Sequence, residues 1–243
     1  MRLNRGDGVE LAYELTAGRG PTIVFLPGFM SDMTGDKAMA IEAWCMAQGR
    51  GCLRLDYSGH GASGGRFEDG TIGRWTQDAL AVIDHAAPGP AVLIGSSMGG
   101  WIALNVAVAR TERIVGLIGI AAAPDFTERL MWPSFSAAQL ETLLIEGMLR
   151  LPSQYGGEQI ITRALIEDGR RHLRLTEPIP LHCPVRLLHG QRDPDVPWRT
   201  SLDIAERLES DDVRVTLVKD GDHRLSRPQD IALLCDTLAT LLT

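Results

Sequence analysis

The chain has 243 residues and a net charge of −7, with 44% apolar, 23% charged and 5% aromatic residues. This composition is typical of a folded globular protein and excludes a disordered one, and because Lys and Arg are dispersed it offers no basic surface to nucleic acid. No stretch of about twenty uncharged apolar residues is available to span a bilayer.

The length suits one domain, which we expect to cover residues 1–243. The beginning of the chain lacks the apolar segment of a secretory signal, and Asp7 and Glu10 are atypical of a transit peptide, so a cytoplasmic location is expected. The cysteines form no C-x-x-C pair and have no zinc-site spacing, which predicts reduced thiols. They are Cys45, Cys52, Cys183 and Cys235.

Strands and helices are expected to alternate after a hairpin-like segment at 9–16. Short apolar runs predict strands at 22–26, 52–55, 91–94, 114–120, 185–189 and 213–218. Helices are expected at 37–48, 72–86 and 98–109. The alternation predicts an α/β fold with a mostly parallel, doubly wound sheet and right-handed crossovers.

The alternation lapses at about 125–180. Apolar residues there have helical spacing, which Pro152 and the glycine pair at 156–157 interrupt. These apolar residues are Leu140, Leu143, Leu144, Met148 and Leu151. We interpret the segment as a short helical cap inserted after the sixth strand; the alternative is two helices packed on the sheet as ordinary core. As part of a cap, the candidate substrate-binding residues are Trp132, Phe135, Leu144 and Met148.

The strongest motif is G-S-S-M-G at 95–99, a G-x-S-x-G pattern between a predicted strand and a predicted helix. A serine on such a turn has a strained backbone, and small residues on both sides prevent collisions with neighbouring backbone. Ser97 is therefore the candidate nucleophile, and Ser96 is interpreted as a packing residue. The helix that follows favours developing negative charge at its N-terminus, so the Met98 amide is a candidate oxyanion donor. The alternative is a Gly/Ser-rich turn without chemistry.

A second oxyanion donor is expected from the loop at 26–31, which follows an earlier strand. Phe29 is the candidate, because Gly28 before it would let the backbone approach a substrate closely. The alternative is that Pro27 and Gly28 form an ordinary turn.

A serine hydroxyl needs a base, and the base needs a third group that orients it. In folds with this turn the chain order is Ser, Asp, His, with the histidine after the last strand. Of six histidines, His223 alone has that position. The others have ordinary explanations as loop, helix-face or strand-end residues: His60, His85, His172, His182 and His189.

The candidate orienting carboxylate is Asp193, three residues after Gly190 at the exit of a predicted strand. Asp195 remains the alternative, since either side chain could reach around a turn. We favour Asp193 for its position at the strand exit and interpret Asp195 as a residue that caps the loop.

Several of these segments carry a family resemblance. They are G-S-S-M-G-G-W at 95–101, D-Y-S-G at 56–59, R-L-L-H-G at 186–190, V-P-W at 196–198, L-P-S-Q-Y at 151–155 and D-H-R at 222–224. From about 25 to 231 the chain resembles the α/β-hydrolase superfamily, in particular the group of mitochondrial palmitoyl-protein thioesterases, also known as mycophenolic acid acyl-glucuronide esterases. The resemblance implies an α/β-hydrolase fold and an acyl-ester or S-acyl hydrolase. It also implies Ser97, Asp193 and His223 as the triad, which supports Asp193 over Asp195.

The pattern and the resemblance together predict a serine hydrolase that cleaves carboxylic ester or thioester bonds through an acyl-enzyme, with no metal or cofactor. The expected substrate is a small acyl ester or thioester, with an S-acylated protein as a further candidate. A small-substrate carboxylesterase, a lactonase and an exopeptidase remain alternatives, because they share the same acyl-transfer steps. A ligand-binding receptor on the same scaffold is the non-enzyme alternative, although such a protein usually lacks a triad member.

Overall fold

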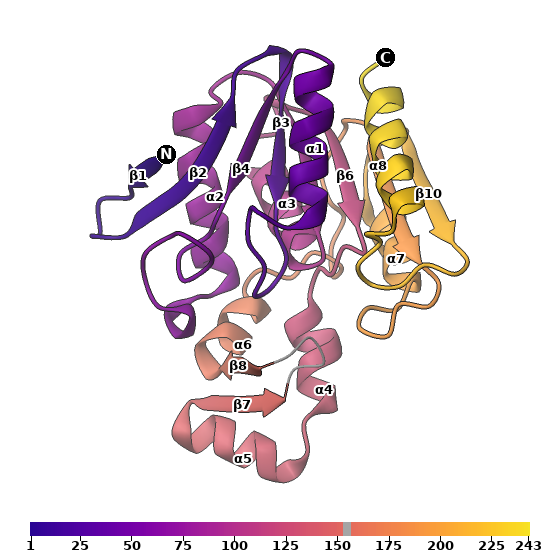
Figure 1. Ribbon diagram of the computed structural model, residues 1–243. Helices are drawn as coiled ribbons and strands as arrows, with labels where there is room; N and C mark the ends of the chain where they lie inside the picture. Colours follow the sequence, from indigo (N-terminus) through magenta and orange to yellow (C-terminus); the bar gives the residue numbers. More distant parts are fainter. Residues whose placement is uncertain (153–156) are drawn as a thin grey trace.

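A twisted eight-stranded sheet forms the centre of the molecule (Figure 1), whose computed structural model describes residues 1–152 and 157–243. The strand order is β1-β2-β4-β3-β5-β6-β9-β10. The strands are β1 (Arg2–Asn4), β2 (Glu10–Thr16), β3 (Arg19–Leu26), β4 (Arg50–Leu55), β5 (Ala91–Ser96), β6 (Ile114–Ile120), β9 (Val185–Gly190) and β10 (Val213–Val218). The pairs from β4 to β10 are parallel, whereas β2 is antiparallel to β1 and β4. The predicted α/β class is confirmed.

Helices cover both faces of the sheet, as the doubly wound pattern predicts (Figure 1). They are α1 (Asp36–Ala47), α2 (Ile72–Ala86), α3 (Met98–Ala109), α7 (Arg199–Arg207) and α8 (Pro228–Leu241). Successive side chains of one strand point to opposite faces of the sheet. In β3, Ile23 belongs to the core cluster with α1 and α8, and Val24 belongs to the cluster with α2 and α3. Every residue of β5 is buried, as expected for a parallel strand covered on both faces.

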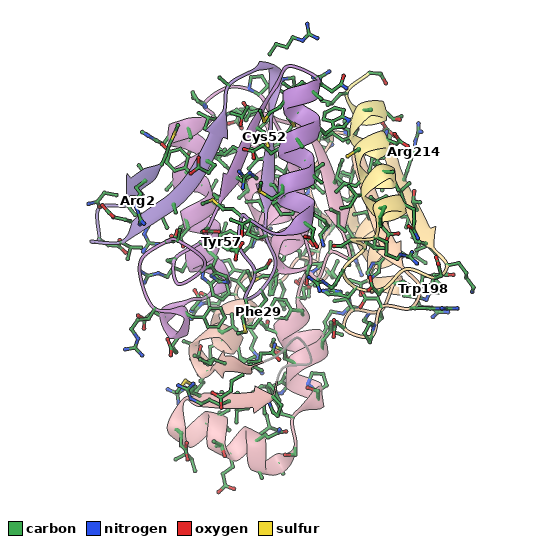
Figure 2. The ribbon with its side chains drawn as sticks, viewed as in Figure 1. Arg2, Phe29, Cys52, Tyr57, Trp198 and Arg214 are labelled. Atoms are coloured by element: carbon green, nitrogen blue, oxygen red, sulfur yellow. The ribbon has the colours of Figure 1, made fainter. Side chains whose placement is uncertain are left out.

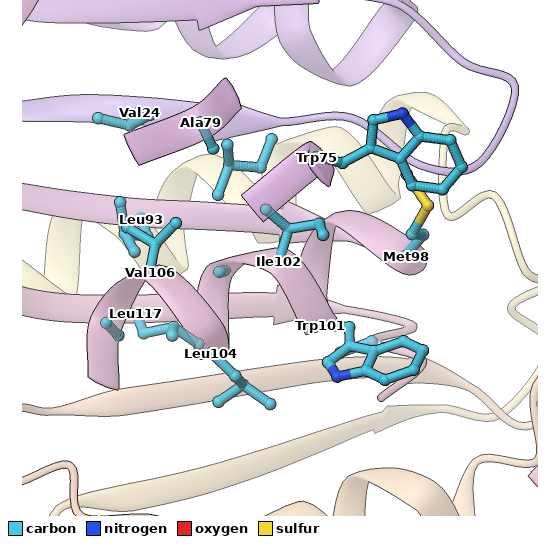
Figure 3. Close-up of a cluster of buried hydrophobic side chains, with 14 of the residues drawn as sticks. Val24, Trp75, Ala79, Leu93, Met98, Trp101, Ile102, Leu104, Val106 and Leu117 are labelled. Atoms are coloured by element: carbon cyan, nitrogen blue, oxygen red, sulfur yellow. The ribbon is translucent and has the colours of Figure 1, made fainter. Parts of the chain in front are cut away.

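The larger core cluster lies between the sheet and the helices α2 and α3 (Figure 3). Trp75 of α2 and Trp101 of α3 are both fully buried in it, with Met98 near Trp75. The first turn of α3, which carries Met98 and Trp101, is therefore packed into this cluster beside Trp75, and this packing holds the end of β5 and the start of α3 in place.

Between β6 and β9 the chain forms a separate layer beyond the carboxyl edge of the sheet, in the lower part of Figure 1. It contains a π-helix (Thr127–Met131), α4 (Trp132–Ser134), α5 (Ala137–Glu146), β7 (Met148–Pro152), β8 (Glu158–Thr162) and α6 (Arg163–Arg170). We call residues 125–175 the insertion. Residues 153–156, which include part of the L-P-S-Q-Y motif and the first glycine of the expected break, lie outside the described residues.

The insertion is not purely helical, which corrects the expectation of a helical cap. Helix α5 ends at Gly147, whose φ of 78° is a left-handed conformation that glycine adopts readily. Met148 and Leu151, which were expected to continue the helical stripe, instead lie in β7, antiparallel to β8. The run Ile160–Thr162 of β8 is β-branched and favours a strand.

Hydrogen bonds fasten both ends of the insertion to each other. Asp125, which is buried, accepts from the backbone amides of Arg174 and Leu175 at 2.7 and 2.8 Å. The indole of Trp101 donates to the His172 carbonyl at 2.9 Å. The insertion is therefore held against the helices that flank β5.

Within the described ranges, none of the helices is both long and apolar enough to cross a membrane.

Candidate active site

Ser97 occupies the sharp turn between β5 and α3. Its φ and ψ are 55° and −120°, a strained combination for a residue with a side chain. A Cβ on Gly95 would come within 2.3 Å of the Gly99 carbonyl oxygen, and one on Gly99 within 2.0 Å of the Leu26 carbonyl oxygen. The two glycines of the motif are thus required by backbone packing, and the turn presents the Ser97 side chain at the carboxyl edge of the sheet.

Three side chains predicted from the sequence meet at that edge through hydrogen bonds. His223 Nε2 lies 3.1 Å from Ser97 Oγ, and His223 Nδ1 lies 2.8 Å from Asp193 Oδ2. Ser97 follows β5, Asp193 follows β9 and His223 follows β10. These strands are parallel, so their carboxyl ends lie at the same edge of the sheet. The Asp193 side chain is fully buried, whereas that of His223 is 16% exposed.

The surroundings of Asp193 favour its ionised form. Oδ1 accepts from the amides of Asp195 and Val196, each at 2.8 Å. Burial on its own would raise the pKa of Asp193, but hydrogen bonds from His189 and His223 outweigh it and lower the pKa well below its ordinary value. Asp195 lies at the cavity wall, and its backbone amide supports Asp193.

His189 belongs to this network, although the sequence indicated only a strand-end residue. Its Nε2 lies 3.1 Å from Asp193 Oδ2 and 3.0 Å from the Val196 carbonyl oxygen, and its Nδ1 lies 2.7 Å from Ser201 Oγ. Both neighbours of Nε2 are acceptors, so we assign the proton to Nε2 and let the Ser201 hydroxyl donate to Nδ1. The spacing H-x-x-x-D around a tight turn was the signal that could have identified it.

Phe29 and Met98, whose amides are the expected oxyanion donors, both line the cavity beside Ser97. In the described part of the chain neither amide donates a hydrogen bond to another protein atom. A Cβ on Gly28 would lie 3.4 Å from the Ser97 Cβ, so this loop passes close to the serine. In Figure 2, Phe29 lies at the level where the sheet meets the insertion.

A cavity of about 890 Å³ opens beside Ser97 and His223. Its apolar part includes Phe29, Met98, Phe126, Leu130, Met131 and Val196. Its polar part includes Ser31, Asp32, Lys37, Ser134, Gln159 and Arg224. The insertion thus forms one wall, and the loop after β3 forms the opposite one.

The four expected substrate-binding residues need correction. The cavity lining does not include Trp132, Phe135, Leu144 or Met148. Trp132 and Phe135 pack in a small core within the insertion, Leu144 is 51% exposed, and Met148 lies in β7. Helical spacing identified an apolar face, but within α5 the buried residue is Leu143, which packs in the core of the insertion rather than toward Ser97. Leu130 and Met131 of the π-helix line the cavity instead.

The loop that carries His223 is bound to α1 and is closed by a hydrogen bond of its own. Lys37 of α1 donates to the Arg224 carbonyl, and the Leu225 amide donates to Asp222 Oδ1 at 3.0 Å. Burial lowers the pKa of Lys37 to about 8. These contacts restrict the imidazole position opposite Ser97.

The chain is similar to known hydrolases in both sequence and structure. A model described as "Alpha/beta hydrolase family" matches residues 23–232. Human mitochondrial palmitoyl-protein thioesterase ABHD10 is 43% identical over 99% of this chain and 79% of its own length. A putative hydrolase from Agrobacterium vitis S4 superposes with a TM-score of 0.95 at 43% identity, covering 100% of this chain and 97% of that one. Mouse alpha/beta hydrolase domain-containing protein 10 gives 0.92 at 42% identity, covering 99% and 97%.

The expected cytoplasmic location is wrong by this comparison, because the ABHD10 relatives at 42–43% identity are named as mitochondrial. A targeting segment is separate from the folded part of a protein. The expectation rested on residues 1–10 rather than on a feature of the folded domain, and the names of the relatives overturn it.

Proposed function

Because the chain belongs to the α/β hydrolase family, we propose that it is a serine hydrolase of ester or thioester bonds with Ser97 as its nucleophile. In this proposal His223 is the general base and Asp193 orients it. The relatives support esterase or thioesterase activity of an α/β hydrolase; the assignment of the residues and of the acyl-enzyme is ours.

The observation that carries the proposal is the continuous hydrogen-bond series from Ser97 through His223 to Asp193. A serine hydroxyl is a weak nucleophile unless a base removes its proton, and Nε2 lies within reach of that proton. The buried, ionised Asp193 keeps the proton of His223 on Nδ1, which leaves Nε2 free to accept.

The reaction begins when Ser97 Oγ attacks the acyl carbon and its proton passes to His223 Nε2. The carbonyl oxygen becomes an oxyanion, to which the backbone amides of Phe29 and Met98 donate. His223 then gives the proton to the leaving alcohol or thiol, and an ester joins the acyl group to Ser97. Water attacks that ester with the same proton transfers, which releases the acid and restores the serine.

The cavity supports an acyl substrate with an apolar chain. Phe126, Leu130 and Met131 offer an apolar surface near Ser97, and apolar surface removed from water contributes about 25 cal/mol per Å². Human ABHD10 is named a palmitoyl-protein thioesterase, and we therefore propose a thioester or S-acyl substrate class for this chain as well.

The test combines active-site labelling with matched serine variants. A fluorophosphonate probe is expected to label Ser97, and Ser97→Ala is expected to lose the label and at least about a thousand-fold in kcat on p-nitrophenyl esters and matched acyl thioesters. Ser96→Ala removes the adjacent hydroxyl, and this variant should keep both the fluorophosphonate label and the wild-type kcat. Labelling at another residue, or undiminished turnover in Ser97→Ala, would refute the proposal.

A further inference from the structure

The loop after β4, residues 56–61, contacts the loop that carries the Phe29 amide, and the proposed reaction gives it no role. Tyr57 donates its hydroxyl proton to the Pro27 carbonyl at 3.2 Å. His60 Nε2 lies 3.3 Å from the Met30 amide nitrogen. Both Tyr57 and His60 are buried. Figure 2 shows Tyr57 just above Phe29.

These contacts act on the peptide groups around Phe29. The Ser31 amide donates to the Gly28 carbonyl at 3.1 Å, which closes a turn over Phe29 and Met30. In a trans peptide the N–H points opposite to the C=O, so the bond at Gly28 directs the Phe29 N–H away from the turn. The contacts at Pro27 and Met30 fix the peptide groups on either side, and three successive peptide planes are thereby restrained.

Met30 needs such support because its own backbone is strained. Its φ of 57° is a left-handed conformation that costs a residue with a side chain about 1 kcal/mol or more. Met30 is 47% exposed, so packing around this residue does not fully hold the turn. The Met30 amide donates its hydrogen bond to His60 Nε2, which helps to hold this strained residue.

His60 can accept that bond only as a neutral imidazole. Its Nδ1 lies 3.3 Å from the Ser58 carbonyl oxygen, so Nδ1 carries the proton and Nε2 accepts from Met30. The ring packs edge-on against Tyr57 and Trp75.

The electrostatic surroundings keep the imidazole neutral. Burial lowers the pKa of His60. The Ser58 carbonyl and the carboxylates of Asp78 on α2 and Asp32 on the loop after β3 would each raise this pKa, but the effect of burial is larger. Tyr57 is the other titratable group against the ring, and burial raises its pKa, so it stays uncharged.

We propose that His60 and Tyr57 are positioning residues that orient the Phe29 amide toward the oxyanion formed at Ser97. His60 accepts from the Met30 amide, Tyr57 donates to the Pro27 carbonyl, and neither touches the substrate. This inference rests on the proposed function, since it concerns the same reaction. The loop 56–61 thereby acts on the rate of acyl transfer rather than on substrate binding.

The test uses two side chains that differ in what they can offer at position 60. His60→Asn retains an N–H group for the Ser58 carbonyl but is too short to accept from Met30, whereas His60→Gln places an amide oxygen near the former Nε2. We expect kcat on a p-nitrophenyl ester to fall about 10- to 100-fold in His60→Asn with KM unchanged, because a misplaced oxyanion donor affects only the transition state. His60→Gln should recover kcat to within a few-fold of wild type.

Thermal unfolding reports whether each variant is folded. Where His60→Asn does not fold, Tyr57→Phe, which loses only the hydroxyl, tests the same loop through a fall in kcat at constant KM. Wild-type kcat in the folded variant, or a His60→Gln variant as slow as His60→Asn, would overturn the inference. If Ser97→Ala remained active, the proposed function itself would fail, so the two failures are distinguishable.

Discussion

At the scale of single residues, the candidate site is a buried carboxylate with more partners than a triad requires. Asp193 Oδ2 faces both His223 and His189, while Oδ1 receives two backbone amides. The negative charge of Asp193 therefore acts on His189 as well as on His223. Because the folded-state pKa of Asp193 is lowered, its bonds stabilise the fold fully above about pH 4, and that contribution declines as the pH falls through the folded-state value.

Replacing His189 with Leu should change the pH dependence of the reaction. Without one donor, Asp193 becomes more basic and attracts the His223 proton more strongly, so the acid limb of kcat/KM should move to higher pH. Stability at pH 7 should fall by about 1–3 kcal/mol, because the Ser201 hydroxyl and Val196 carbonyl lose a buried partner. The measurements are pH-rate profiles and urea unfolding.

Ser201→Ala is the matched control, since it removes the partner of His189 Nδ1 but leaves Nε2 facing Asp193. It should shift the acid limb less than His189→Leu does. An unchanged acid limb in His189→Leu would show that His189 serves packing alone.

The sequence predicted the meeting of Ser97, Asp193 and His223 because each follows a recognisable strand, and strand order along the chain is readable. His60 was assigned an ordinary role because its partner Met30 lies in another loop, and His189 because its short spacing to Asp193 was interpreted only as the end of a strand. A linear sequence does not reveal that Ser201 of α7 or Met30 of a distant loop would lie within hydrogen-bond distance. The catalytic roles themselves remain a prediction.

At the scale of elements, the turn between β5 and α3 depends on close contact with the neighbouring strand. Leu26 at the end of β3 pairs with Gly95, and its carbonyl oxygen occupies the space where a side chain on Gly99 would begin. The motif is therefore a property of two strands and one helix rather than of five residues.

Gly99→Ala is accordingly expected to destabilise the protein by about 2 kcal/mol or more, because the clash is with backbone and cannot be relieved by a side-chain rotation. Gly89→Ala is the control: its added Cβ would meet nothing within 4 Å, and the change should stay within about 0.5 kcal/mol. Denaturant midpoints measure both. Equal midpoints for the two variants would contradict this account of the turn.

Most sheet strands and flanking helices could be predicted because continuous apolar runs and helical spacing are local signals. The boundary between α5 and β7 could not, since the same apolar residues suit a helix or a strand. Gly147 decides between them through its left-handed backbone, and the pairing with β8 requires a segment further along the chain. The expected hairpin at 9–16 is likewise a single strand, β2, paired with β1 and β4.

At the scale of the whole molecule, one cavity wall comes from the sheet edge and the other from the insertion. The lapse in alternation predicted where the insertion lies but not which of its residues face Ser97. The insertion has a core of its own, in which Phe135, Leu143 and Ile161 are buried. Its apolar residues therefore divide between that core and the cavity, and only the tertiary structure determines the division.

The division predicts which insertion residue controls substrate size. Leu130→Trp narrows the cavity and should lower kcat/KM for long acyl chains relative to short ones by about 10-fold, within the range that pocket shape typically supplies. Leu144→Trp makes the same change at a residue that is 51% exposed and outside the cavity lining, and it should leave the ratio unchanged. The measurement is kcat/KM on p-nitrophenyl esters of increasing acyl length. An equal effect of both variants would contradict the assignment of Leu130 to the cavity wall.

The Asp125 carboxylate, shortly after the end of β6, binds the backbone amides of Arg174 and Leu175 on the returning chain, so the insertion begins and ends at one place. Because the points of departure and return adjoin, a segment of different length or sequence can be accommodated there without altering strand register. Selectivity and chemistry can thus diversify independently: descendants of one ancestor can exchange this segment to acquire new substrates while they keep the same reacting groups.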